Sequence, residues 1–126
     1  MSAAVGGEPV SFITTEKTDD LIVSFAITDA TTIWGVLSLT LLRTPKYEFA
    51  LPEDERRVAV SHESHPETRM RKFLQFIRVV PPAVMIETTA RRYELDVSKV
   101  ERQEIRSALE VLKRMNFDGT FVLEQG

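Results

Sequence analysis

The amino-acid sequence predicts an α+β fold: an antiparallel β-meander of about five strands in the first half, packed on two or three helices in the second half. Up to about residue 65, apolar residues alternate with polar ones in short runs that turn-forming clusters separate. Beyond this point apolar residues recur three and four positions apart on charged segments, the pattern of amphipathic helices. Strands that precede helices, instead of alternating with them, are typical of α+β proteins and not of the parallel nucleotide-binding folds.

Five runs in the first half have strand character. Short polar or proline-containing turns connect them, which favours an antiparallel meander. The run over residues 33–42 is apolar on both faces, so we expect it at the centre of the sheet, with cover needed on both sides. The runs cover residues 10–15, 21–28, 33–42, 46–51 and 56–61.

The second half, from about residue 66 to 116, is predicted to be helical. Residues 64–67 have the composition of a helix start, with Ser64 or His65 at the cap, proline near the first turn and glutamate to complement the dipole. An apolar stripe at i, i+3, i+4 and i+7 follows, and Pro81 and Pro82 end the helix. The stripe consists of Met70, Phe73, Leu74 and Ile77.

The remaining segments are a second helical region and a short strand. Residues 83–95 fit either a helix or a strand, and we favour the helix. Ser98 and Glu101 form a capping-box pattern, after which an apolar stripe predicts a helix to about Asn116. A final short strand is expected at about residues 120–124.

Length and composition predict one domain over residues 1–126. The absence of cysteine excludes disulfides, thiol nucleophiles and cysteine-ligated zinc. The first seven residues lack the basic and apolar regions of a signal peptide, and the apolar run at 33–42 is half as long as a membrane span requires. We therefore expect a cytoplasmic protein without membrane association.

The net charge of −3 is unevenly distributed, with −5 over residues 1–65 and +4 over residues 66–116. Convergent cations are what a phosphate backbone requires. Such clusters are also common on ordinary solvated helix faces, which is the alternative interpretation. The candidate contacts to an anion or a nucleic acid are Arg71, Arg78, Arg91 and Arg92.

Residues 86–123 also fit a helix-turn-helix followed by a wing, which would make the protein a DNA-binding regulator. The spacing is close to that of the motif, but Glu94 stands where the turn usually has glycine. Glu101 and Glu104, at the start of the expected reading helix, would face an anionic groove. These glutamates disfavour DNA binding, which remains an alternative.

Candidate catalytic and metal-binding groups are weak. Residues 62–65, with Glu67 nearby, form the group that contains side chains able to bind a metal. Their two histidines are three residues apart, however, and do not form the helical His-Glu-x-x-His motif. We therefore expect a solvated junction there, and no metal or cofactor. The sequence has no nucleophile elbow and no glycine-rich phosphate loop. An enzyme without a linear motif remains an alternative.

Trp34, the only tryptophan, and Tyr47 are candidates for an interface or a pocket. We expect Trp34 to be buried in the core or in an interface, near Tyr47 and Phe49. The leading hypothesis is a small non-enzymatic interaction or regulatory protein that binds another macromolecule. Its partner is expected to be a protein or a second copy of the chain in a dimer, because the two-sided apolar run needs cover.

Overall fold

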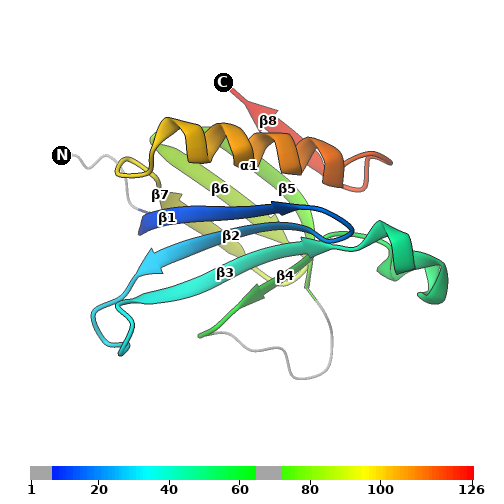
Figure 1. The fold of residues 1–126 in the computed structure, drawn as a ribbon, viewed down its shortest axis with the longest axis horizontal. Coiled ribbons are helices and arrows are strands. Elements are labelled where there is room, and N and C mark those ends of the chain that lie inside the picture. Colours follow the sequence, from blue (N-terminus) through cyan, green and yellow to red (C-terminus); the bar gives the residue numbers. More distant parts are fainter. Residues whose placement is uncertain (1–6, 65–71) are drawn as a thin grey trace.

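The computed structural model of the chain describes residues 7–64 and 72–126, and it corrects the predicted fold class. The described residues are mostly β: eight strands form one mixed sheet, and α1 (Arg102–Met115) is the one long helix, in place of a five-strand meander on two or three helices (Figure 1). The strands are β1 (Glu8–Lys17), β2 (Leu21–Thr28), β3 (Val36–Arg43), β4 (Ala59–His62), β5 (Lys72–Val80), β6 (Ala83–Thr88), β7 (Arg92–Asp96) and β8 (Val122–Gln125).

The strands close into a ring. Their order is β4-β3-β2-β1-β7-β6-β5-β8, and β4 also pairs with β5, so that β1 to β7 surround a common interior. Neighbours in the ring are antiparallel except β1 and β7, which pair in parallel through Glu8 with Leu95 and Pro9 with Asp96. A ring with an odd number of strands requires one such parallel step. β8 runs parallel to β5 along the part of its edge that β4 leaves open.

The helix α1 covers the edge of β1 that lies beyond its short pairing with β7 (Figure 1). The Ile13 N–H donates to Glu104 Oε1 at 2.7 Å, so a carboxylate accepts from a backbone group that has no neighbouring strand there. The helix predicted to end near Asn116 is thus confirmed, although it begins only at Arg102 and Glu101 caps it without a side-chain hydrogen bond. Its buried residues are Ile105, Ala108, Val111, Leu112 and Met115.

The core fills the ring. Leu39 and Leu41 of β3 are both fully buried and alternate with outward-facing residues, as the period-two pattern predicted. The strand over 21–28 is confirmed for the same reason, with an inner row from Leu21 to Ile27. Facing side chains from the other strands and from α1 complete one hydrophobic cluster.

The predicted helix from about residue 66 to Pro81 is wrong where the structure describes it, because residues 72–80 form β5. A β-bulge between Leu74 and Phe76 inserts one residue, so that Leu74 and Ile77 both point inward although they are three positions apart. The bulge thereby gives a strand the i, i+3 spacing of a helix. The predicted cap at His65 and the stripe residue Met70 lie outside the described residues.

Residues 83–95 are also strands, β6 and β7, and not the favoured helix. Their inner residues alternate with period two, from Val84 and Ile86 in β6 to Tyr93 and Leu95 in β7. The first helix of the predicted helix-turn-helix is therefore absent from this segment.

The expected strand over 46–51 is instead a 3₁₀ helix, η1 (Pro45–Ala50), followed by η2 (Glu53–Glu55). The alternation of apolar and polar residues over 46–51 gave a wrong strand prediction, because the buried side chain in this segment is that of Glu48, while Phe49 is 79% exposed. The final strand lies close to its predicted position. In the described ranges, we find no helix with both the length and the apolar character needed to cross a membrane.

Candidate functional site

The β2–β3 connection, residues 29–35, is a loop held by its own hydrogen bonds. The Asp29 carboxylate accepts from the Thr31 N–H at 2.8 Å and from the Thr31 hydroxyl at 2.6 Å, which lowers the pKa of Asp29. The Asp29 N–H donates to the Gly35 carbonyl at 2.8 Å and closes the loop at its base. Gly35 has a φ of +75°, a conformation that glycine adopts without strain.

This loop presents two large apolar side chains to solvent. Ile33 is 89% exposed and its neighbour Trp34 is 83% exposed, so Trp34 is not part of the core as we had expected. Single exposed apolar residues are ordinary on protein surfaces. Two adjacent ones, on a loop that its own hydrogen bonds fix, form a preorganised apolar tip, which we call the Trp34 tip.

Trp34 and Tyr47 do not lie together. Trp34 precedes β3 and Tyr47 follows it, and eight strand residues correspond to about 25 Å of chain. Tyr47 is 57% exposed on η1, with the Lys46 ammonium 5.7 Å from its ring centroid. A shallow cavity of about 310 Å³ adjoins Tyr47, Leu42 and Leu51. The two aromatic residues therefore belong to separate surfaces.

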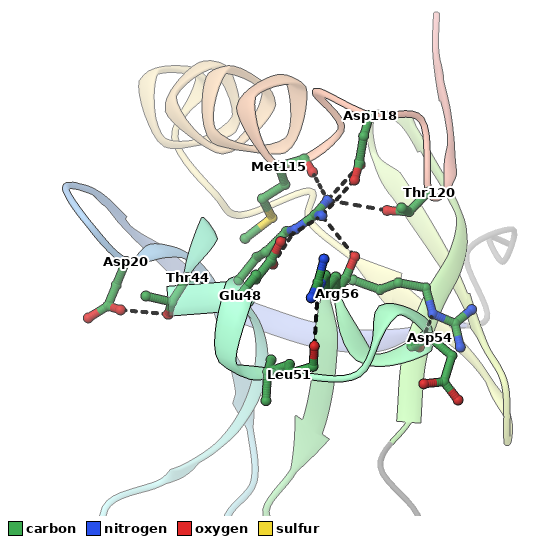
Figure 2. A network of polar contacts seen from close by, with 11 residues as sticks. Asp20, Thr44, Glu48, Leu51, Asp54, Arg56, Met115, Asp118 and Thr120 are labelled. Carbon is green, nitrogen blue, oxygen red and sulfur yellow. Dashed lines mark hydrogen bonds and ion pairs between the residues drawn. The ribbon is translucent and has the colours of Figure 1, made fainter. Parts of the chain in front are cut away.

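A buried arginine that the sequence analysis did not single out organises the end of the molecule near η1. The Arg43 side chain is fully buried and forms two-pronged pairs with Glu48, at 2.7 and 3.0 Å, and with Asp118, at 2.8 Å to each oxygen. It also donates to the backbone carbonyls of Met115 and Arg56 at 2.8 Å. Figure 2 shows Glu48 on η1 converging with Met115 and Asp118, which lie at the end of α1 and in the turn after it.

The Arg43 network is structural. Burial by itself lowers the pKa of Arg43, but the hydrogen bonds to Asp118 and Glu48 raise it above its ordinary range. The same pairing lowers the pKa of Asp118. All of the guanidinium nitrogens donate to protein oxygens, so Arg43 offers no donor to a ligand.

A second polar cluster faces the interior of the ring. The buried Lys72 ammonium donates to the Tyr93 hydroxyl at 3.2 Å, and the His62 ring stacks on Tyr93 with centroids 5.6 Å apart. His62 Nδ1 accepts from the Ser64 N–H at 3.0 Å, which places the proton of a neutral ring on Nε2. These contacts offset part of the cost of burying a lysine.

The histidine cluster does not form a metal centre in the described residues. No group of three or more histidine, aspartate or glutamate side chains gathers there at metal-binding distance. His62 faces the interior, while His65 and Glu67 lie outside the described ranges.

The described candidate anion contacts lie on β5, on β7 and in the turn between β6 and β7. Arg78 pairs with Glu124 at 2.9 Å, and Arg92 lies 4.0 Å from Glu87 and 3.6 Å from Glu94. Arg91 is exposed in the β6–β7 turn, where its carbonyl accepts from the Thr88 N–H. Arg71 lies outside the described residues. Arg78 and Arg92 are thus each partly neutralised by glutamates.

Searches against protein-family models, characterised proteins and solved structures find no significant match to this chain.

Proposed function

We propose that this protein acts by binding another protein, and that the Trp34 tip is its contact. The observation that carries the proposal is the exposure of Ile33 and Trp34 on a loop fixed by Asp29 and Gly35. Tryptophan is among the residues that most often dominate the energy of protein interfaces. A preformed loop also loses little conformational entropy when it binds.

The energy available is sufficient to anchor a complex. An aromatic side chain as exposed as Trp34 buries about 150–200 Å² in a fitting pocket. At about 25 cal/mol per Å², this contributes roughly 4 kcal/mol before the costs of association. Ile33 beside it adds a smaller apolar contribution.

Nucleic-acid binding through the arginines is the rival function. The glutamates that pair with Arg78 and Arg92 must be displaced or approached by phosphate, which is unfavourable. The net charge of −3 opposes association with DNA as well. These charges support the protein-binding proposal over the rival.

The test begins with a photoreactive residue at position 33, which cross-links the protein that occupies the tip in an extract of the source cells. The purified partner is then titrated by calorimetry against wild type, Trp34→Ala and Tyr47→Ala. We expect Trp34→Ala to weaken binding at least about tenfold, and Tyr47→Ala, an exposed aromatic on the other surface, to leave it within about twofold.

Trp34 is also a spectroscopic probe, because it is the only tryptophan. With a partner peptide that lacks tryptophan, its emission should move to shorter wavelength and become protected from iodide quenching. If the purified partner binds wild type and Trp34→Ala with equal affinity, the proposal is contradicted. A salt-sensitive, sub-micromolar complex with duplex DNA that Arg91→Ala weakens establishes the rival instead.

A further inference from the structure

The outward side of β1–β4 is nearly free of charge. The strand registers align its side chains in three rows that cross the strands, and the ionisable residues lie at the ends of two rows. Glu16 lies on β1, and Glu63 follows β4 beside Ser38, with its carboxylate accepting from the Ser38 N–H at 2.6 Å. The rows are Phe12-Ala26-Ser38, Thr14-Ser24-Thr40-Ser61 and Glu16-Ile22-Leu42-Ala59, and we call this surface the outer face.

The outer face is open to solvent. Phe12 is 44% exposed and Leu42 is 36% exposed, and Thr14 and Ser61 are exposed as well. Figure 1 shows β5–β7 behind these strands and α1 along the edge of β1, so no described element covers the outer face. Charged residues make up 28% of the chain. On this four-strand face they lie at the ends of two rows, and the positions between them carry no charge.

We propose that the outer face is the contact between two copies of this chain, related by a two-fold axis. In such a contact the same surface meets itself, so any net charge on it would be repelled by its copy. The interior of the outer face, which is made of small hydroxyl and apolar side chains, avoids this repulsion. It offers no charge pattern that would select a different protein. Two sheets packed face to face at about 10 Å form a sandwich, in which the strands of the two copies lie nearly aligned.

The area of the face sets the strength of the contact. Four strands at about 4.8 Å spacing and three rows at about 6.7 Å give a patch of about 400 Å² per copy. The resulting total of about 800 Å² lies below the range of stable complexes and within that of transient ones. We therefore infer a dimer that forms in the micromolar range. This inference concerns a different surface from the Trp34 tip and does not depend on the proposed function.

The experiment measures mass by light scattering and sedimentation between about 5 and 500 µM. For the wild type, the average mass should rise from 14.3 kDa toward twice that value. Thr40→Arg and Thr14→Arg, which place like charges on the face, should remain monomeric across this range. Gln75→Arg, at an exposed position of β5, is the matched control and should dimerise like the wild type. Circular dichroism checks that each variant is folded.

A mixing experiment separates a contact at this face from an indirect effect. Thr40→Arg and Thr40→Glu should each be monomeric alone and should form a heterodimer when mixed, because opposite charges then meet near the centre of the face. A monomeric wild type at the highest concentration overturns the proposal. So does a dimer that neither Thr40→Arg nor Thr14→Arg weakens, or one that Gln75→Arg disrupts equally.

Discussion

Arg43 shows how a single charged side chain is accommodated in an otherwise apolar row. It continues the inward-facing row of Leu39 and Leu41 on β3, so its guanidinium points into the protein. The two carboxylates of Glu48 and Asp118 compensate for the desolvation of this cation. Its bond to the Met115 carbonyl also places a positive charge at the C-terminal end of α1, which the helix dipole favours.

Replacement of Arg43 should be strongly destabilising because it leaves Glu48 buried without its cation. We expect Arg43→Met to lower the free energy of unfolding by about 3–5 kcal/mol, as is usual when one partner of a buried ion pair is removed. Arg43→Lys should recover only part of this loss, since an ammonium cannot form two-pronged pairs with both carboxylates. Urea denaturation measures both values, and a loss below about 1 kcal/mol for Arg43→Met would contradict the structural role.

The carboxylate of Asp118 should make stability depend on acid pH. Its pKa is lowered in the folded state by Arg43, so its contribution is present above the unfolded value of about 3.9 and is lost as pH falls through the folded pKa. Asp118→Asn should therefore be less stable than wild type at pH 6, and the difference should shrink below about pH 4. Unfolding free energies measured from pH 6 to pH 2.5 test this. A difference that stays constant with pH would show that the charge of Asp118 is not involved.

Two leucines should differ in their contribution because the structure buries them differently. Leu39 is fully buried within the ring, whereas Leu109 on α1 is only partly buried against the core. We expect Leu39→Ala to cost about 2–5 kcal/mol and Leu109→Ala less than half as much. Chemical denaturation of both variants measures the two losses. Equal losses would mean that the contacts of α1 are misplaced.

At the scale of elements, the sequence predicted strands best where the ladder is regular. The alternation in β2, and in β3 from Val36, is uninterrupted, so these inner rows followed directly from the sequence. The run predicted over 33–42 began too early, because residues 33–35 belong to the β2–β3 loop and Ile33 is exposed. In β1 and β5 a β-bulge interrupts the ladder, and the inward residues become three apart: Val10 and Ile13 in the one, Leu74 and Ile77 in the other. Such bulges depend on the partner strand and leave no local signal. The helix prediction failed in β5 for this reason.

The candidate site was predictable only in part. A lone tryptophan is more often buried than exposed, so the exposure of Trp34 could not be inferred from its type. The flanking Asp29 and Gly35 did carry a signal, because aspartate and glycine are residues that turns require. The buried position of Arg43 was also encoded, since it continues the period of Leu39 and Leu41.

The loop of the Trp34 tip should lose its order when its internal hydrogen bonds are removed. Asp29→Ala eliminates the bonds to the Thr31 N–H and hydroxyl but leaves the strands intact. Time-resolved fluorescence anisotropy of Trp34 should then show faster local motion than in the wild type. Asp19→Ala, which removes an exposed ion pair with Lys46 at the other end of β2, should leave this motion unchanged. Unchanged motion in Asp29→Ala would show that the loop does not depend on these bonds.

At the scale of the whole molecule, the ring is complete only because separate segments cover its two weak joints. The β1–β7 step consists of two residue pairs, and α1 lies along the rest of that edge of β1. The β4–β5 step is also limited to two pairs, and β8 continues along β5 where β4 ends. The C-terminal third of the chain therefore supplies closure that the first-half strands cannot provide.

Removal of β8 provides a test of this closure. The strand is mostly exposed and contributes little to the core, but its loss leaves the second half of β5 unpaired on the edge opposite β6. We expect a chain that ends at Phe121 to remain folded, with about 1–3 kcal/mol less stability because the β5–β8 hydrogen bonds are lost. Its unpaired edge should also produce assemblies larger than a dimer as concentration rises, since open strand edges pair with one another.

A chain that ends at Phe117 is the informative comparison, because it also removes Asp118 and the buried Phe121 and should therefore lose considerably more stability. Denaturation and light scattering of the two truncated chains measure these effects. If the first truncation matches the wild type in both stability and mass, β8 has no part in closing the ring.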